Sequence, residues 1–270
     1  MKNVVRLIWL LVFVVALIHI IHALTLDRTI EYKEVRFYSS RWPQVLDGYQ
    51  IAFVTDTHVM SDEALLDVVE QINAWQADLL LLGGDFTFRG SHYRRTMAIL
   101  SQTETTDGIF GVEGNHDDFR HLFAAMEAYG IVPLSNNGIH IHEGFYLAGV
   151  EDLWNRNPCV AKSIADATED DFVLLISHNP DVSMQQDTTG VDLILSGHTH
   201  GGQITFFGIW APYFTFTGFT GYGQRFVCGW AVSRDGVPVY ISRGVGQYLP
   251  RVFARPQVIL VTMATGPKMF

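Results

Sequence analysis

The sequence predicts an α/β fold, in which helices cover a sheet, behind an N-terminal membrane anchor. Three observations support this prediction. The first 24 residues are apolar and almost uncharged, short apolar runs then alternate with stretches of helical periodicity, and 48% of the 270 residues are hydrophobic. Such a chain can bury a substantial core. Alternating strands and helices are typical of a sheet with helices packed on its faces.

The anchor is predicted from residues 7–24, LIWLLVFVVALIHIIHAL, which carry no formal charge across 18 residues. That length is just sufficient to cross a hydrocarbon core about 30 Å thick. A cleaved signal peptide is the alternative, since Ala23 suits a cleavage site. Against it, the run exceeds the usual apolar region of about 7–15 residues, and Ile21 is not small. We expect an uncleaved single-pass protein of the cell inner membrane.

The charges around this span weakly indicate its orientation. Lys2 and Arg6 precede the span, whereas the residues that follow it carry both signs. The positive-inside rule therefore favours a cytoplasmic N-terminus and a body on the far side. Because only two charges support it, the side on which the body lies stays open.

Three parts are expected along the chain: the anchor over 1–24, a connecting segment over 25–48, and one domain over 49–270. In the domain, residues 62–76 space their apolar positions at three and four and follow Ser61, a suitable N-cap. Residues 118–129 repeat this helical spacing and end at a glycine. Both segments are predicted to be helices.

Five apolar runs in the domain are followed at once by polar residues. The runs are residues 51–54, 78–82, 109–112, 172–176 and 191–195. The polar side chains after them are Asp56, His58, Asp85, Asn115, His116, Asp117, His178, His198 and His200. In sheets with helical crossovers, ligands bind beyond the carboxyl ends of the strands. If the strands lie side by side, these side chains converge at one edge.

Imidazole and carboxylate ligands together suit Mn, Fe or Zn, whereas a set made only of oxygens favours Mg or Ca. The candidate ligands are Asp56, His58, Asp85, Asn115, His178, His198 and His200. Seven ligands exceed the need of one ion, but two ions that share one carboxylate have four protein ligands each. Two ions about 3.5–4 Å apart clamp the entering and leaving oxygens of a phosphoryl group. The expected cofactors are two divalent ions, with Mn first and Zn or Fe as alternatives.

The same residues form five ordered motifs, DTH, GGDF, GNHD, SHNPD and GHTHGGQ, over residues 51–203. In order and spacing, these motifs resemble those of the calcineurin-like metallophosphoesterase family. Residues 241–261 resemble the C-terminal part of its membrane-anchored phosphodiesterase branch, which is similar to UDP-2,3-diacylglucosamine hydrolases of lipid A synthesis. The resemblance implies a four-layer α/β/β/α sandwich (the metallo-dependent phosphatase fold) and makes residues 49–270 the catalytic domain.

The resemblance also implies roles for the candidate residues. One ion is held by Asp56, His58, Asp85 and His200. The other is held by Asp85, Asn115, His178 and His198, so that Asp85 bridges the two. His116 is then the general acid that protonates the leaving oxygen, with Asp117 holding its other nitrogen; the alternative is that His116 only hydrogen-bonds a phosphate oxygen.

Two departures from the resemblance leave the substrate open. The chain has no twin-arginine export signal, and some lipid A hydrolases of a related branch carry Arg where this chain has His116. The expected substrate is a phosphodiester or pyrophosphate, either a small molecule or a lipid-linked compound such as UDP-2,3-diacylglucosamine. The alternatives are a general phosphodiesterase and, in a different class, a noncatalytic membrane-tethered module that binds metal or a partner.

Composition argues against a nucleic-acid partner. The net charge is −10, and beyond the two basic residues of the anchor the chain holds 16 basic and 28 acidic residues. Nucleic-acid backbones are bound largely through neutralised phosphates, so a nuclease is disfavoured. The two cysteines, Cys159 and Cys228, fit no metal-ligand spacing and form one disulfide or none.

An aromatic segment and two arginines are further candidates for substrate contact. Residues 206–230 hold ten aromatic side chains, which belong either to the core of a second sheet or to an apolar lip beside the metals that accepts acyl chains or rests on the bilayer. Arg89 and Arg243 follow strand-like segments and are candidates for phosphate contact or for surface ion pairs.

Overall fold

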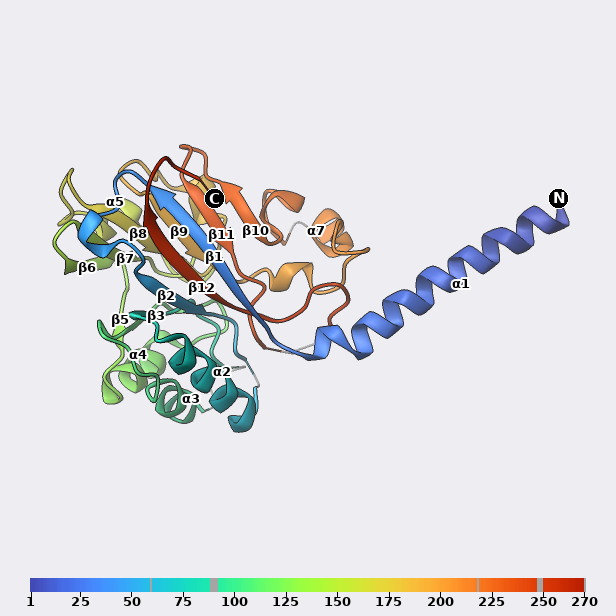
Figure 1. The fold of residues 1–270 in the computed structure, drawn as a ribbon, viewed down its shortest axis with the longest axis horizontal. Coiled ribbons are helices and arrows are strands. Elements are labelled where there is room, and N and C mark those ends of the chain that lie inside the picture. The colour runs from blue at the N-terminus through green and yellow to red at the C-terminus, as the bar shows by residue number, and fades with distance from the viewer. Residues whose placement is uncertain (59, 88–91, 218, 247–249, 270) are drawn as a thin grey trace.

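The computed structural model describes residues 1–58, 60–87, 92–217, 219–246 and 250–269. Its helices are α1 (Lys2–Leu24), α2 (Asp62–Trp75), α3 (Tyr93–Leu100), α4 (Phe119–Ala128), α5 (Val160–Ser163), α6 (Val182–Gln185) and α7 (Pro212–Thr217). Short 3-10 turns lie at Leu26–Arg28, Gln44–Leu46, His200–Gly202 and Gly223–Phe226. Figure 1 shows α1 projecting from one end of a body built on two sheets.

The first sheet has six strands in the order β1-β12-β2-β3-β4-β5. They are β1 (Glu31–Ser39), β2 (Gln50–Val54), β3 (Leu79–Leu82), β4 (Ile109–Gly111), β5 (Val132–Pro133) and β12 (Gln257–Thr265). From β2 to β5 each strand is parallel to its neighbour, whereas β12 runs antiparallel to β2. The carboxyl ends of β2, β3 and β4 therefore lie at one edge of this sheet.

The second sheet also has six strands, in the order β10-β11-β9-β8-β7-β6. They are β6 (Asn137–His142), β7 (Phe145–Gly149), β8 (Phe172–Ile176), β9 (Leu193–Ser196), β10 (Gly229–Val232) and β11 (Pro238–Ile241). The strands β7, β8, β9 and β11 are parallel to one another, and antiparallel edge strands flank them.

The two sheets face each other, and helices cover their outer faces, so the four-layer α/β/β/α expectation is confirmed. In β2, Ile51 and Phe53 lie in the core between the sheets, whereas Ala52 and Val54 pack toward α2, α3 and α4. A third cluster lies on the outer face of the second sheet around Phe226. A strand buried on both faces explains the continuous apolar runs in the sequence.

Both predicted helices are present. Ser61 caps α2 by accepting a hydrogen bond from the backbone N–H of Ala64 at 3.2 Å. Asp118 caps α4 in the same way, and the chain then leaves through Gly130 at a φ of +73°, where glycine avoids the steric cost of left-handed backbone.

The segment between α1 and residue 49 has more regular structure than the sequence predicts. Residues 31–39 form β1, which pairs in parallel with β12 along all nine residues. It is an edge strand with four charged side chains, and all four stay partly or fully exposed. An edge strand with such polarity lacks the apolar signal of the buried strands, so residues 25–48 are predicted as a connection although they contribute a strand.

The N-terminal helix is long and apolar enough to cross a membrane. None of its residues is buried against the body, and it stands clear of the body for most of its length (Figure 1). Cys159 and Cys228, whose pairing the sequence leaves open, are both free thiols.

Candidate metal centre

The five predicted strand ends converge on one pocket of about 300 Å³. The strands β2, β3 and β4 of the first sheet and β8 and β9 of the second all lead into it. Six of the sequence-predicted side chains line the pocket, namely His58, Asp85, Asn115, His116, His198 and His200. Asp56 and His178 lie behind this lining and are 0% and 1% exposed. The structure thus brings all seven candidate ligands together.

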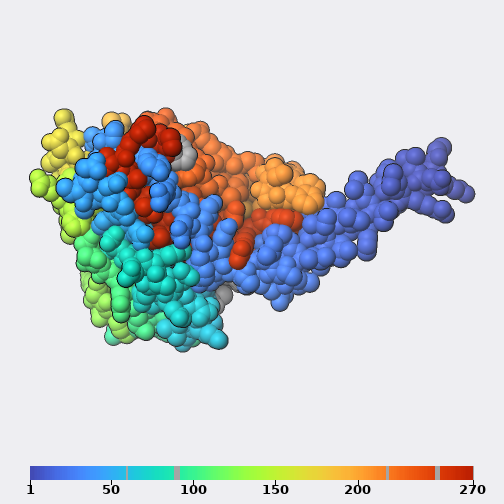
Figure 2. All heavy atoms as spheres, viewed as in Figure 1, coloured from blue at the N-terminus to red at the C-terminus, as the bar shows by residue number. Residues whose placement is uncertain are grey.

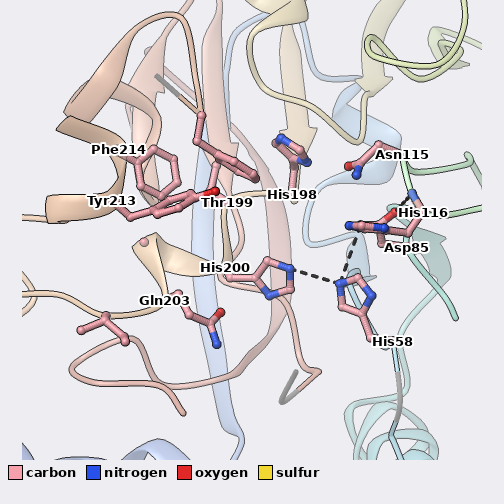
Figure 3. Close-up of a pocket in the computed structure, with 13 residues that line it drawn as sticks. His58, Asp85, Asn115, His116, His198, Thr199, His200, Gln203, Tyr213 and Phe214 are labelled. Atoms are coloured by element: carbon pink, nitrogen blue, oxygen red, sulfur yellow. Dashed lines mark hydrogen bonds and ion pairs between the residues drawn. The ribbon is translucent and has the colours of Figure 1, made fainter. Parts of the chain in front are cut away.

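Two groups of buried carboxylate and imidazole ligands stand side by side. In one group, ligand atoms of Asp56, His58 and His200 all lie within 4.8 Å of one another, and the other group joins Asp56 to Asp85 and His178. The Nε2 atoms of His58 and His200 are 3.1 Å apart, and Nε2 of His200 is 3.5 Å from Oδ1 of Asp56. Figure 3 shows the rings of His58 and His200 facing one another in the pocket.

Asp85 is a member of the second group and also lies near His58 of the first. Its Oδ2 atom is 3.3 Å from Nε2 of His178 and 3.7 Å from Nε2 of His58. Oδ1 of Asn115 is 3.2 Å from the same His178 nitrogen. Nδ1 of His178 lies 2.7 Å from the carbonyl oxygen of Gly83, and donation to that oxygen aims the Nε2 atom at the pocket.

Five of the candidate ligands have left-handed backbone. The φ angles are 56° at Asp56, 42° at His58, 57° at Asp85, 70° at His198 and 50° at His200. Left-handed backbone costs a non-glycine residue about 1–3 kcal/mol and persists only where the surroundings enforce it. Five residues with left-handed backbone at one pocket indicate a functional site, and this evidence is independent of the sequence motifs.

Two glycines permit the close packing of the ligands. A Cβ atom at Gly197 would lie 2.2 Å from Oγ1 of Thr55 and 2.4 Å from Oδ2 of Asp56. A Cβ atom at Gly114 would lie 2.2 Å from Oδ1 of Asp85. Since any side chain would displace a carboxylate at either position, these glycines are required by close approach rather than by backbone conformation.

The environment keeps most of the imidazoles neutral. Burial lowers the pKa of His58, His198 and His200, and nearby His178 and Arg251 lower it further for His198 and His200 respectively. A neutral imidazole is the form that binds a metal. Burial opposes the charge on Asp85, but His178 holds the pKa of this carboxylate below its ordinary value.

The residues fit a pair of divalent ions. The donor set combines imidazoles with buried carboxylates, as borderline metals prefer. Burial lowers the pKa of three of these imidazoles, whereas at His178 burial is outweighed by the charge of Asp85, which raises the pKa. The Nε2 atom of His198 is buried and, among the described residues, has no hydrogen-bond partner. Its ring is held by Phe219, which stacks at 4.6 Å, and by Trp154, which meets it edge-on at 4.5 Å.

His116 differs from the ligands because it is exposed at the pocket wall. Its backbone N–H donates to Oδ1 of Asp85 at 2.8 Å, so the Asp85 carboxylate fixes the backbone of His116 at the pocket. The His116 and His58 rings lie 5.6 Å apart. An exposed imidazole beside buried ligands is arranged to meet a substrate.

The carboxylate of Asp117 binds backbone groups of the ligand loops. Its Oδ2 accepts hydrogen bonds from the backbone N–H groups of Asp85 and Gly114, at 2.7 and 2.9 Å, and its Oδ1 accepts one from Phe86 at 3.1 Å. Burial and the charge of Asp85 raise the pKa of Asp117 to about 8. The carboxyl group therefore fixes the backbone of the two ligand loops.

Sequence reasoning missed Arg251, whose guanidinium is buried behind His200. It donates to the carbonyl oxygens of His200, Arg243, Gly244, Gly246 and Ala254. Its Nη2 atom also lies 3.2 Å from Nδ1 of His200. A lone Arg in a loop gives no local signal, because these partners come from segments that meet only in the fold.

The two arginines suggested for phosphate contact have different outcomes. Arg89 lies outside the described residues. Arg243 forms an ion pair with Glu31 of β1, with 3.1 Å between Nη1 and Oε2. This contact joins two parts of the fold, as the surface ion-pair alternative predicts.

Comparisons with known proteins identify the family of this chain. Residues 49–202 match the calcineurin-like phosphoesterase family. The chain is 29% identical over 253 residues to the uncharacterized metallophosphoesterase YkuE of Bacillus subtilis (strain 168), covering 87% of this chain and 85% of YkuE. It is 28% identical over 235 residues to the phosphodiesterase YaeI of Escherichia coli (strain K12), covering 80% and 82%.

A third relative is longer than this chain. It is an uncharacterized metallophosphoesterase of Helicobacter pylori (strain ATCC 700392 / 26695), 27% identical over 241 residues. The alignment covers 84% of this chain but only 62% of the relative.

Proposed function

The chain belongs to the calcineurin-like phosphoesterase family of metal-dependent phosphohydrolases, and we propose that it hydrolyses a phosphodiester or pyrophosphate bond with two divalent ions. In this proposal one ion is held by Asp56, His58, Asp85 and His200. The other is held by Asp85, Asn115, His178 and His198.

The observation that carries the proposal is the position of Asp85. Its Oδ2 atom lies within 3.7 Å of an imidazole nitrogen from each ligand group, which supports a carboxylate shared by two ions. Asp56 is the residue that belongs to both groups, but its Oδ2 atom accepts hydrogen bonds from the His198 backbone N–H and the Thr55 hydroxyl. We therefore assign the bridging role to Asp85.

When bound, two divalent ions supply Lewis acidity toward phosphoryl oxygens and lower the pKa of water. Manganese is the first choice, with Zn or Fe as alternatives. His116 lies at the pocket wall, where its imidazolium donates a proton to the departing oxygen. Asp117 acts as a positioning residue, because it holds the backbone of the loops that carry Asp85 and Asn115.

The proposed substrate is lipid-linked, with UDP-2,3-diacylglucosamine of lipid A biosynthesis as the specific example, and the proposed location is the cell inner membrane. The pocket supports an amphiphilic substrate, since Ile204, Tyr213, Phe214 and Phe219 line it beside the ligands. Figure 3 shows Tyr213 and Phe214 on the side of the pocket away from Asp85. The second candidate is a general phosphodiesterase of water-soluble small molecules, and the similarity to the phosphodiesterase YaeI supports phosphodiester chemistry for either candidate.

Hydrolysis by the purified full chain tests the enzymatic part of the proposal. The chain in detergent is loaded with Mn²⁺ and given bis-p-nitrophenyl phosphate, alongside Asp85→Ala and His116→Ala. Turnover that depends on metal and on both residues supports the proposal. Absence of turnover with metal bound, or equal turnover in all three proteins, contradicts it.

Lipid analysis after depletion of the protein tests the substrate. Accumulation of UDP-2,3-diacylglucosamine in the mass spectrum of total lipids supports the specific example. An unchanged lipid profile contradicts a lipid-linked substrate and favours the water-soluble class.

A further inference from the structure

An apolar surface lies between the pocket and the N-terminal helix. It consists of Ile204, Phe206, Ile209, Trp210, Tyr213 and Phe216, and we call it the aromatic face. All six side chains are at least 40% exposed, and Ile209 and Phe216 reach 85% and 78%. Soluble surfaces rarely gather large apolar side chains in this way unless they bind an apolar partner. In Figure 2 the orange segment that carries this face lies at the end of the body from which α1 projects.

The C-terminal end of α1 is packed against the same segment. The ring of His19 lies 5.3 Å from that of Phe206, 4.5 Å from Phe207 and 4.9 Å from Phe253. His22 stacks on Phe253 at 3.8 Å and also contacts Asp27. Asp27 in turn accepts hydrogen bonds from the backbone N–H groups of Phe253 and Ala254. These contacts fix the position of the aromatic face along the axis of α1.

That position places the aromatic face near the boundary between hydrocarbon and headgroups. The uncharged run of α1 ends at Leu24 and has 18 residues, a length of about 27 Å at 1.5 Å per residue. A hydrocarbon core about 30 Å thick requires all of it. His19 lies five residues before the end of the run, or about 7 Å along the axis. The rings that contact His19 therefore lie within about 7 Å of the level at which the uncharged run ends, on the hydrocarbon side of the headgroups.

The aromatic face is continuous with the pocket. Ile204 and Tyr213 belong to the face and also line the pocket that holds Asp85 and His116. One segment thus contacts the C-terminal part of α1 through Phe206 and lines the pocket through Ile204 and Tyr213. Aromatic side chains at a membrane–water boundary are characteristic of interfacial anchoring.

We propose that the aromatic face inserts into the bilayer that α1 crosses and holds the apolar rim of the pocket at the lipid–water boundary. The substrate class that this arrangement admits is a phosphoester amphiphile, which reaches the pocket from the same bilayer while its acyl chains stay in lipid. The insertion rests on geometry alone, whereas the substrate class rests on the proposed phosphoesterase function.

Insertion is tested with a fluorophore at residue 209. The full chain with Cys159→Ser, Cys228→Ser and Ile209→Cys is labelled and reconstituted into phosphatidylethanolamine–phosphatidylglycerol vesicles. The control is Val45→Cys in the same background, because Val45 is 88% exposed. Its neighbour Pro43 lies against Gly144 between β6 and β7, at the end of the body away from α1 (Figure 1).

Lipids brominated on their acyl chains should quench the label at 209 and leave the label at 45 bright, whereas aqueous iodide should do the reverse. A label at 209 that iodide quenches and brominated lipid does not would overturn insertion. Shielding from both quenchers would overturn it as well, because a protein partner would then cover the aromatic face.

The substrate class is tested with two phosphodiesters of the same leaving group. Ile209→Ser with Phe216→Ser should lower the hydrolysis of p-nitrophenyl hexadecyl phosphate in vesicles by about tenfold or more. Hydrolysis of soluble bis-p-nitrophenyl phosphate should stay within about twofold, because neither residue lines the pocket. Val45→Ser should change neither rate.

The outcomes separate the two proposals. Equal rates for the double variant and the unaltered chain on the vesicle substrate overturn membrane delivery while leaving the phosphoesterase intact. Failure of the unaltered, metal-loaded chain to hydrolyse the soluble diester overturns the phosphoesterase, and the quenching result still decides whether the aromatic face inserts.

Discussion

The Nε2 atoms of His58 and His200 lie 3.1 Å apart, and their rings are stacked with an interplanar angle of 19°. These residues are 142 positions apart and reach the pocket from opposite sheets. Burial lowers the pKa of both imidazoles, so each ring is neutral near pH 7. Two neutral imidazole nitrogens directed at one another, with the Asp56 carboxylate beside them, form a ready pair of ligands for one cation.

Asp85→Asn should remove the second ion and most of the activity. The amide cannot supply the negative charge that two ions share, so we expect a loss of at least about 100-fold in kcat together with lower metal content. Metal analysis and bis-p-nitrophenyl phosphate hydrolysis on the same samples check this. Asp67→Asn, on the exposed side of α2, is the control. Full metal content and normal turnover in Asp85→Asn would refute the bridging role.

His116→Gln should separate catalysis from metal binding. The side chain lies at the pocket wall and outside the ligand groups, so metal content should stay the same. Loss of a general acid lowers the rate by about 10²–10⁴-fold. Parallel measurement of kcat and bound metal decides the outcome. If metal content falls as well, His116 acts on the ligands; if kcat is unchanged, it is not the acid.

Gly197→Ala should disturb the ligands through packing alone. The added methyl group would meet Thr55 and Asp56 at about 2.2–2.4 Å, and overpacking of this kind costs about 1–3 kcal/mol. We expect a lower unfolding temperature and weaker Mn²⁺ binding. Gly221→Ala is the matched control, since its nearest neighbour, an oxygen of Asp181, would lie at an ordinary 3.6 Å. Equal metal affinity in both variants would contradict the close-approach argument.

Arg251→Met should destabilise the chain and loosen its hold on metal. It leaves several buried carbonyl oxygens without a donor, among them that of His200, so the free energy of unfolding should fall by about 3 kcal/mol or more. Loss of a residue that orients a ligand lowers metal affinity by about 10–100-fold. Arg255→Met is the control, since this arginine is bonded at the surface to carbonyl oxygens of residues 29 and 30.

Calorimetric Mn²⁺ titration and denaturant unfolding measure the two effects. Stability lost without any change in metal affinity would show that Arg251 supports the fold but does not position His200.

Asp171→Asn should give a pH-dependent loss of stability away from the metal centre. Burial opposes the charge of Asp171, but hydrogen bonds from Thr168 and His140 hold its pKa below the ordinary value of 3.8. A depressed folded-state pKa contributes stability above the unfolded pKa, and this contribution is lost as pH falls through the folded value.

The gap in unfolding free energy between the unaltered chain and Asp171→Asn should therefore be about 1–2 kcal/mol at pH 5–7. It should close below about pH 4. Denaturant unfolding at several pH values checks this. A gap that is constant from pH 7 to pH 3 would show that the effect is steric.

The sequence predicts the strands that position the site because they are buried on both faces. Leu79–Leu82, for example, form a continuous apolar run, and Asp85 follows at once in the chain. The ligand groups follow from the same reasoning, since parallel strands end at a shared edge. The strand at residues 31–39 is not predicted, because an edge strand keeps its charged side chains partly exposed and so lacks a continuous apolar run.

The long-range contacts of the site cannot be predicted from local pattern. Arg251 contacts His200 across 51 positions, and Asp117 reaches the Asp85 backbone across 32. The left-handed backbone at His58 and His198 is also set by the fold, because a positive φ is uncommon for any residue other than glycine.

The central claim is that two ions act together at this centre, and a metal titration tests it most directly. Metal-free full chain in detergent is titrated with Mn²⁺ while bound metal and bis-p-nitrophenyl phosphate hydrolysis are followed on the same samples. Our account predicts saturation at two ions per chain, with full activity only after the second ion binds. Saturation at one ion, or activity that does not depend on bound metal, would contradict it.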